Sequence, residues 1–296
     1  MLGSPCCGRA TTWRHCSLFE AGEDGDIAVL LQGGVSSVFY VEWEIFGIYV
    51  RPIYPLRVAS FCLHVLRGLL TCTLVFPHCT EQRRLDHVQR WSARLLEICG
   101  VELIPSDVPV APMGVMIVAN HISWLDIFVL NACQPCYFIA KSEVRRWPVL
   151  GWLAVRAGTL FIERQNARAL TPLMDVVTAR LRLGSQVAYF PEGTSAAQGA
   201  MLPFHPALFG AARRAAVPIR PVALGYFSEQ GKVHRGAEYI GDSTFVSSVL
   251  RILHGPPFVA RVMFLPLINP LGLERRAVAH ASHRAIHVAL SDDSSA

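Results

Sequence analysis

The sequence predicts an α/β protein with a mostly parallel sheet flanked by helices, preceded by N-terminal helices that associate with a membrane. Three observations carry this prediction. After residue 100, short apolar runs alternate with amphipathic segments, which is typical of repeated strand–helix units. Residues 41–100 are rich in apolar, aromatic and basic side chains. Finally, 52% of the 296 residues are hydrophobic and only 17% are charged, so the chain is more apolar than a typical soluble domain.

The composition also limits the classes of function. Disorder is excluded, because a disordered chain is poor in apolar residues and rich in charge. The net charge is +5, and 25 of the 27 basic residues are arginine, whose planar guanidinium binds phosphate groups and anionic lipid surfaces. No nucleic-acid motif is present, and we expect no nucleic-acid partner. The nine cysteines lack disulfide spacing, which indicates a reducing, cytosol-facing compartment.

The N-terminal region, residues 1–40, matches no structural pattern and lacks the positive start and cleavage site of a signal peptide. We leave it as an unassigned extension. The next stretch places aromatic side chains beside arginines, a mixture that favours the headgroup level of a bilayer. These residues are Trp43, Phe46, Tyr49, Tyr54, Arg51 and Arg57.

A mostly apolar segment follows from Val58 to Phe76 and is closed by Pro77. Its length is nominally enough to span a bilayer. However, polar side chains recur every three or four residues and form one stripe along a helix: Ser60, His64, Arg67 and Thr71. A charge at the bilayer centre costs about 2.5–3.5 kcal/mol. We therefore favour a helix that lies in the interface or dips shallowly into it over one that spans the bilayer, and the spanning helix stays an alternative. A core helix of a soluble protein is the third interpretation.

A second amphipathic helix is predicted at Gln82–Cys99, with Gly100 as its C-terminal cap. Its apolar stripe is Leu85, Val88, Trp91, Leu95 and Ile98, and its basic side is Arg83, Arg84, Arg90 and Arg94. Such a helix rests on an anionic membrane or on the protein's own core, and both interpretations stay open. We assign 41–100 to membrane-associated helices.

The remaining elements follow from hydrophobic period and turn residues. Strands are expected at Val115–Ala119, Tyr137–Ala140, Thr159–Ile162, Gln186–Phe190, Ile219–Leu224 and Val259–Leu265. Helices are expected at Trp124–Cys133, Ala167–Leu183, Pro206–Ala216 and Glu274–Leu290. In parallel sheets, functional sites lie at the carboxyl ends of the strands, so the residues that follow these strands are the first candidates for chemistry.

The segment Asn-His-Ile-Ser-Trp-Leu-Asp at 120–126 directly follows the first of these strands. His121, with Asp126 five residues later, has the residue types of a general base whose tautomer is held by a carboxylate. The stretch from Ser123 to Asp126 also fits a capping box that starts the next helix. A cap alone would not require His121.

Two other strand ends carry polar residues. Glu192, Gly193 and Thr194 can bind hydroxyl groups through the carboxylate and backbone N–H groups, although Pro-Glu-Gly is also an ordinary turn. Arg164 closes the strand at 159–162, where it can bind a phosphate. Most arginines in such a place are plain surface residues.

Together these motifs resemble the glycerolipid acyltransferase family that acylates lysophosphatidic acid. That family has N-H-x4-D, G-x-x-F-I-x-R, F-P-E-G-T and V-P-[IV]-x-P-[VA] in this order, and here the blocks stand at 120–126, 158–164, 190–194 and 217–222. Segments 141–143 and 147–151 are similar to its K-x-E and W-P-x-x-G segments. The resemblance covers about Val41 to Leu224. It identifies 101–225 as the acyltransferase catalytic core and 226–296 as the C-terminal part of the same α/β domain.

The resemblance implies an O-acyltransferase that moves a fatty acyl chain from an acyl-CoA or acyl-carrier-protein thioester to a lysophospholipid. The favoured acceptor is 1-acyl-sn-glycerol-3-phosphate, which gives phosphatidate. His121 would take the proton of the acceptor hydroxyl and Asp126 would orient the imidazole, while Arg164, Glu192, Gly193 and Thr194 would bind the acceptor. No cofactor or metal is implied. Membrane lipids would be the partners, at the cytoplasmic face of the inner (plasma) membrane.

Two departures from the family pattern leave the acceptor open. Many members continue E-G-T with Arg, whereas Ser195-Ala196-Ala197 follows here. The later P-F-K-x-G-x-F pattern reads P-F-H-P-A-L-F at 203–209. Both changes weaken the case for a phosphate on the acceptor. Acyltransferases of lyso-ornithine lipid have similar substitutions, so this lipid is the alternative acceptor.

Interpretations of another class have less support. Gly241-Asp242-Ser243 is similar to the motif of G-D-S lipid hydrolases, with Ser243 as the nucleophile, but it lies late in the chain and no Asp-x-x-His follows it. A non-catalytic lipid-binding membrane protein is the other alternative, and the intact pair of His121 and Asp126 argues against it.

Metal or redox chemistry is not favoured either. Cys133 and Cys136 form a C-x-x-C pair, but a zinc site needs a second pair at suitable spacing. His280, His283 and His287 share one face of the last predicted helix. A basic surface stripe is the favoured interpretation there.

Overall fold

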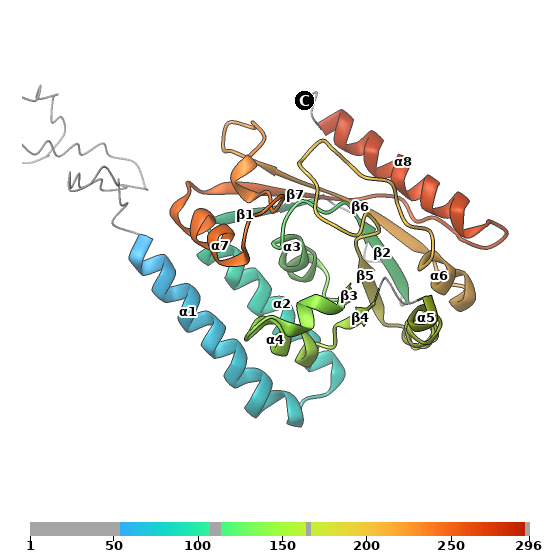
Figure 1. Cartoon of the computed structure of the whole chain (residues 1–296), viewed down its shortest axis with the longest axis horizontal. Coiled ribbons are helices and arrows are strands. Elements are labelled where there is room, and N and C mark those ends of the chain that lie inside the picture. The colour runs from blue at the N-terminus through green and yellow to red at the C-terminus, as the bar shows by residue number, and fades with distance from the viewer. Residues whose placement is uncertain (1–53, 107–113, 164–166, 294–296) are drawn as a thin grey trace, which may run out of the picture. The chain divides into compact units, whose positions relative to one another are not determined.

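The computed structural model describes residues 54–106, 114–163 and 167–293 of the chain (Figure 1). The predicted extension 1–40, the segment 41–53 and Arg164 lie outside these residues.

Seven strands form one sheet in the order β1-β7-β6-β2-β5-β3-β4. Their bounds are β1 Val101–Pro105, β2 Val115–Ala119, β3 Tyr137–Lys141, β4 Leu160–Ile162, β5 Gln186–Tyr189, β6 Ile219–Phe227 and β7 Phe258–Phe264. Every neighbouring pair is parallel except β6 and β7, which run antiparallel. The mostly parallel α/β sheet predicted from the sequence is therefore confirmed.

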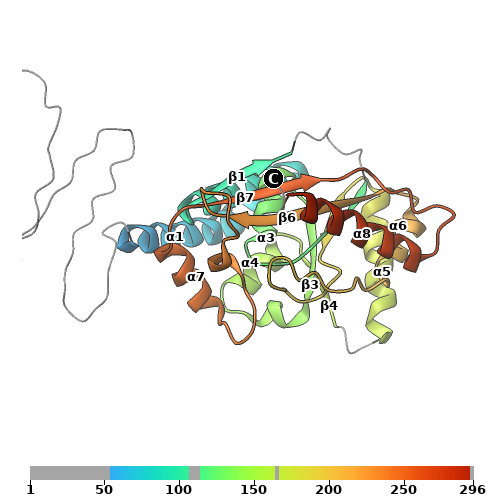
Figure 2. The ribbon, with the colours of Figure 1, turned by 90° about the horizontal axis from the view of Figure 1, so that it is seen from above.

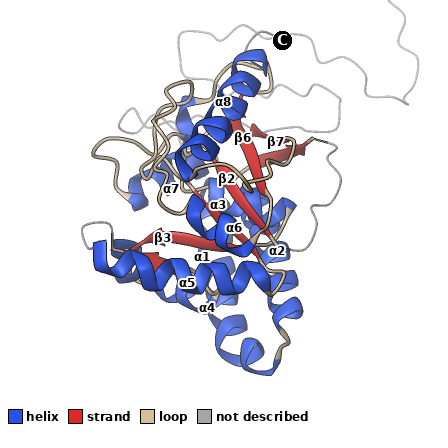
Figure 3. Ribbon diagram, turned by 90° about the vertical axis from the view of Figure 1, so that its right-hand side faces the viewer, coloured by secondary structure: helices blue, strands red, loops and turns tan. Residues whose placement is uncertain are grey.

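Helices cover both faces of this sheet (Figures 1 and 3). One face packs against α2 Glu81–Ile98, α3 Asp126–Cys133 and α7 Phe245–His254, and the other against α5 Ala167–Arg182, α6 Phe209–Ala215 and α8 Arg275–Asp293. The central strand β2 shows why its sequence is apolar throughout: Val115 and Ile117 belong to the first core and Met116 and Val118 to the second. From above, α8 runs alongside β6 (Figure 2).

The N-terminal helix α1, Tyr54–Leu70, continues as a π-helical turn, Thr71–Val75, and a 3₁₀ turn, Phe76–His78. Within the described residues, only the segment Tyr54–His78 is long and apolar enough to cross a membrane by length and composition, and 17% of its most apolar stretch is buried. The predicted polar stripe is not one exposed face. His64 is buried against α2, whereas Arg67 is exposed.

Leucines form the outer face of α1 instead: Leu56, Leu63, Leu66 and Leu70 are all exposed. The inner face is fixed by a reciprocal contact with α2. The His64 ring stacks on Trp91 at 4.6 Å, His64 Nε2 donates to Trp91 O at 2.9 Å, and Trp91 Nε1 donates to His64 O at 3.1 Å. Of the two interpretations of the second helix, the structure shows the one in which α2 packs on the protein's own core.

The sequence patterns missed three elements. The edge strand β1 is half exposed and lacks a clear alternation, α4 Leu150–Arg156 is only seven residues long, and α7 lies in the C-terminal part, where only a strand at 259–265 and a helix at 274–290 were predicted. Strand β6 also extends beyond its predicted end at Leu224 to Phe227. The extension brings Tyr226 into the strand.

Candidate active site

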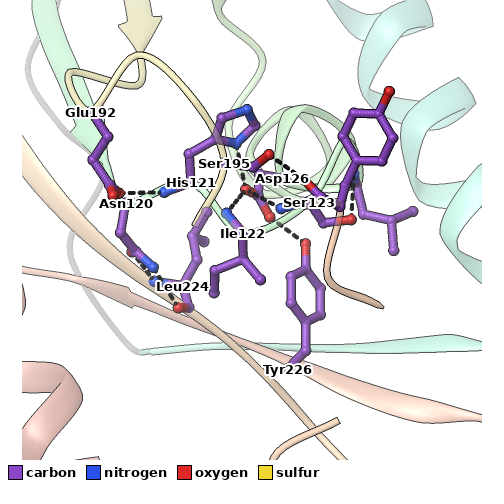
Figure 4. A network of polar contacts seen from close by, with 11 residues as sticks. Asn120, His121, Ile122, Ser123, Asp126, Glu192, Ser195, Leu224 and Tyr226 are labelled. Atoms are coloured by element: carbon purple, nitrogen blue, oxygen red, sulfur yellow. Dashed lines mark hydrogen bonds and ion pairs between the residues drawn. The ribbon is translucent and has the colours of Figure 1, made fainter. Parts of the chain in front are cut away.

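The site begins where β2 ends. Asn120, the first residue after the strand, is buried and bonds the neighbouring strand β6 through both atoms of its amide. Its Nδ2 donates to Leu224 O at 3.0 Å, and its Oδ1 accepts from Leu224 N at 2.8 Å. This pair of hydrogen bonds between the end of β2 and β6 fixes the backbone from which His121 projects (Figure 4).

His121 and Asp126, the two predicted catalytic residues, are in direct contact. His121 Nδ1 lies 2.8 Å from Asp126 Oδ2. The Asp126 carboxylate is completely buried, and the His121 side chain is 20% exposed. Because the carboxylate acts as an acceptor here, the proton of the neutral imidazole lies on Nδ1 and the lone pair on Nε2. Figure 4 shows this second nitrogen pointing away from Asp126, as a general base requires.

The same carboxylate also starts helix α3. Asp126 Oδ2 accepts from the backbone N–H groups of Ile122 at 2.7 Å and Ser123 at 3.0 Å, and Ser123 Oγ accepts from Leu125 N at 3.3 Å. The cap and the base were alternative interpretations of one motif. In the structure the two interpretations are compatible, because the Asp126 oxygen that accepts from Ile122 N and Ser123 N also faces His121 Nδ1.

Aromatic rings stack against the imidazole of His121. The His121 ring stacks on Phe190 with centroids 4.1 Å apart and planes 9° apart, and Phe190 stacks on Phe138 at 5.9 Å. Phe138 and Trp124 also line an apolar cavity of 170 Å³, whose other walls include Gly68 of α1 and residues of α4. Two aromatic rings, Phe190 and Phe138, therefore separate the cavity from His121.

Glu192 also holds the histidine. It is 4% exposed, with Oε1 accepting from His121 N at 2.8 Å and Oε2 from Leu202 N at 2.7 Å. Burial raises the pKa of this carboxyl above its usual value, and the two N–H donors partly offset that effect. Both oxygens are already used by the backbone. The direct contact with an acceptor, which the family resemblance implies for Glu192, stays a prediction.

The other predicted acceptor-binding residues lie beside Glu192 or outside the described chain. Gly193 has φ +81°, a left-handed conformation that suits glycine, and its N–H donates to Phe190 O at 3.1 Å. Thr194 is exposed next to it. Arg164 lies outside the described residues.

Sequence reasoning missed two polar contacts of the site. Tyr226 OH donates to Asp126 Oδ1 at 2.6 Å, and no pattern pointed to it because the strand was expected to end at Leu224. Ser195 Oγ donates to Tyr239 O, and Tyr239 N donates to Ile122 O at 2.9 Å. The sequence pattern marks Ser195 only as the replacement of an arginine. In the structure it links the loop after β5 to Tyr239, which in turn bonds Ile122.

The rival sites are not assembled. Ser243 lies in the turn before α7, and within the described part of the chain no hydrogen bond joins it to a histidine. Burial raises the pKa of Cys133 to about 12 and that of Cys136 still further, so both thiols stay protonated and are poor nucleophiles. Among the described residues, no group of three or more His, Cys, Asp or Glu is placed to hold a metal ion.

An oriented histidine at the end of a central strand, separated from an apolar cavity by Phe190 and Phe138, is compatible with general-base chemistry on an apolar substrate. The chain belongs to the acyltransferase family, as its motifs predicted. The family model, described as Acyltransferase, matches residues 97–225. A lyso-ornithine lipid O-acyltransferase from Pseudomonas aeruginosa is 36% identical over 201 residues, which are 68% of this chain and 76% of that protein.

Two further proteins define the range of relatives. A 1-acyl-sn-glycerol-3-phosphate acyltransferase from Neisseria meningitidis is 37% identical over 186 residues, 62% of this chain and 72% of that protein. The crystal structure of the lysophosphatidate acyltransferase PlsC from Thermotoga maritima matches with a TM-score of 0.55 at 18% identity, and covers 80% of this chain and 97% of that one. That likeness shows the fold.

Proposed function

We propose that the protein transfers a fatty acyl chain from an acyl-CoA or acyl-carrier-protein thioester to the hydroxyl of 1-acyl-sn-glycerol-3-phosphate, giving phosphatidate. The observation that carries the proposal is the 2.8 Å contact between His121 Nδ1 and the buried Asp126 carboxylate. This contact leaves Nε2 as the proton acceptor. The relative from Neisseria meningitidis, whose name states this activity, supports the choice of acceptor.

In the proposed reaction, His121 Nε2 takes the proton of the acceptor hydroxyl as its oxygen attacks the thioester carbonyl carbon. The resulting imidazolium lies against the Asp126 carboxylate, which stabilises it. Collapse of the tetrahedral intermediate breaks the C–S bond, and the leaving thiolate takes the proton from His121. The thioester is already activated, so neither a covalent acyl-enzyme nor a cofactor is needed. General-base catalysis of this kind contributes about 10²–10⁴-fold in rate.

We place the acyl chain in the apolar cavity next to Phe138. In this proposal Gly193, Thr194 and Arg164 contact the acceptor. Glu192 does not contact the acceptor in this proposal; it holds the backbone N–H of His121 through its carboxylate.

A second acceptor, lyso-ornithine lipid, is favoured by one specific observation. Where many family members carry an arginine, this chain has Ser195, and its hydroxyl donates to Tyr239 O. The position therefore offers no cation to a phosphate. The relative from Pseudomonas aeruginosa is named for this acceptor.

The test uses the full chain in detergent micelles, a radiolabelled acyl thioester on CoA or carrier protein, and each of the two lyso-lipids. Labelled phosphatidate is the expected product. Acylation of lyso-ornithine lipid alone would move the assignment to the second acceptor. His121→Ala should lose at least about 10²-fold in rate, while His280→Ala, an exposed histidine on α8, should keep full activity. Unchanged activity in His121→Ala would refute the base, and a labelled bond between the acyl group and Ser243 would favour a serine hydrolase.

We also propose that α1 lies on the cytoplasmic face of the inner membrane, with its outer leucines in the interface. Leu63 and Leu66 are both exposed on this face, although burial of one such side chain is worth about 1.5–3 kcal/mol. Replacing both by Glu should release the protein from sedimenting phosphatidylglycerol vesicles. Leu183→Glu, which changes an even more exposed leucine after α5, should still sediment. Equal sedimentation of both variants would refute this face.

A further inference from the structure

We infer that Tyr226 is a positioning residue of this active site: its phenol holds the Asp126 carboxylate and, through that carboxylate, the ring of His121. The inference rests on the proposed function. It starts from a hydrogen bond that no family motif contains, between Tyr226 OH and Asp126 Oδ1 at 2.6 Å.

The two oxygens of Asp126 have unequal surroundings. Oδ2 accepts from three donors, namely His121 Nδ1 and the N–H groups of Ile122 and Ser123. Within the described part of the chain, Oδ1 has one hydrogen-bond partner, Tyr226. A carboxylate has about two acceptor positions on each oxygen, so the donors crowd around Oδ2 and Tyr226 is the donor that holds Oδ1. The two backbone N–H groups hold Oδ2 and the phenol holds Oδ1, so together they keep the carboxylate from turning about its Cβ–Cγ bond, away from His121.

Tyr226 itself is held firmly enough to do this. It is 1% exposed, and its ring packs edge-on against Phe258 with centroids 5.9 Å apart. Its backbone N–H donates to Gln198 Oε1 at 2.7 Å, and its carbonyl oxygen accepts from His234 N at 2.9 Å. The hydroxyl therefore has a fixed position near the end of β6.

The phenol also keeps its proton. Burial, and next to it the negative charge of Asp126, raise the pKa of Tyr226 well above its usual value. The O–H group is therefore a donor to Asp126 at neutral pH. A hydrogen bond to a charged group is one of the stronger kinds in proteins.

The structure supplies a matched control in the same sheet. Tyr189 of β5 is also buried, at 5% exposed, but its hydroxyl has no hydrogen-bond partner among the described residues. Tyr226→Phe and Tyr189→Phe each remove one buried phenolic oxygen from a strand and leave the ring in place. They differ in whether that oxygen contacts Asp126.

We expect Tyr226→Phe to lower kcat about 10- to 100-fold with the KM for the acyl donor changed less than about twofold. Tyr189→Phe should keep kcat within about twofold. In an Asp126→Asn background, adding Tyr226→Phe should cost less than about threefold, because the group that it positions is already altered. A Tyr226→Phe enzyme with unchanged kcat, or the same loss in both backgrounds, would overturn the inference.

A second measurement needs no substrate and therefore separates this inference from the proposed function. In ¹H–¹⁵N spectra of histidine-labelled protein, the ring signals of His121 are identified by their loss in His121→Ala. They should shift in Tyr226→Phe and stay in place in Tyr189→Phe. A purely structural role would lower Tm without moving these signals. If the wild type transfers no acyl chain but the signals shift as expected, the proposed function fails and the positioning of His121 stands.

Discussion

Glu192 offers the sharpest test of how the site is built, because two explanations of this residue predict different kinetics. The carboxylate accepts from the backbone N–H groups of both His121 and Leu202. Glu192→Gln keeps the shape of the side chain but has only one acceptor oxygen, and its NH₂ group must face the second N–H donor. The variant therefore replaces one hydrogen bond by a contact between two donors.

The expected size of the effect follows from the burial of Glu192. A buried donor left without an acceptor costs about 1–3 kcal/mol. If a displaced His121 adds this whole cost to the activation barrier, kcat falls about 5- to 150-fold, because each 1.36 kcal/mol corresponds to a tenfold change in rate. The same cost should lower Tm by about 2–4 °C per kcal/mol. The KM for the acceptor should change little, because the substituted group faces the backbone of the protein.

The assay is steady-state acyl transfer with both substrates varied, together with thermal unfolding. Glu238→Gln is the matched control: Glu238 is also buried, and its Oε1 accepts from the backbone of Gln198 at 3.1 Å. Because only one Glu238 oxygen accepts a backbone N–H, the amide oxygen of Gln can keep that bond, and both Tm and kcat should stay close to the wild type, with kcat within about threefold. Should Glu192→Gln instead raise the acceptor KM at unchanged kcat and Tm, Glu192 contacts the acceptor directly and the reasoning fails.

Two further predictions concern packing and thiol chemistry. Gly68→Ala on α1 should destabilise the protein by about 1–3 kcal/mol in urea unfolding, because a Cβ there would lie 2.8 Å from Trp91 Nε1. Gly210→Ala is the control, since this helical glycine has its nearest contact at 3.4 Å and the change should be neutral or stabilising. Equal effects of the two changes would show that α1 adjusts freely. At pH 8 a thiol of pKa about 12 is only about 10⁻⁴ thiolate, so brief iodoacetamide treatment of the folded protein should label the exposed Cys62 and leave Cys133 unlabelled by peptide mass spectrometry. Rapid labelling of Cys133 would contradict its burial.

The sheet was predictable because its signals are local. A run such as 115–119 must lie between two helical layers to bury every side chain, and its length identifies it as a strand. The edge strand β1 escaped prediction because it buries little and therefore carries little pattern. The polar stripe of α1 misled for a related reason: periodicity places His64 on one face of a helix, but only the contact with Trp91 shows that this face is the buried one.

The candidate active site also has a part that is local in the sequence and a part that is not. The pair of His121 and Asp126 is separated by five residues, so its spacing and the cap of α3 are visible in the sequence. The groups that hold the pair come from far away in the chain: Glu192 is 71 residues from His121, and Tyr226 is 100 residues from Asp126. Such contacts depend on the register of β2 against β5 and β6, which no single sequence pattern specifies.

This division has a consequence for how the acceptor is chosen. The frame around His121 is made by buried groups on three neighbouring strands or their ends, and none of these groups needs to touch the substrate. Ser195 and Thr194 lie on the outer side of that frame, in the loop after β5. A change such as serine for arginine at 195 can therefore exchange a phosphate contact for a link to Tyr239 without moving the imidazole. In the proposed reaction, the fold thus separates the proton transfer, which would be the same for any acceptor hydroxyl, from the recognition of the headgroup.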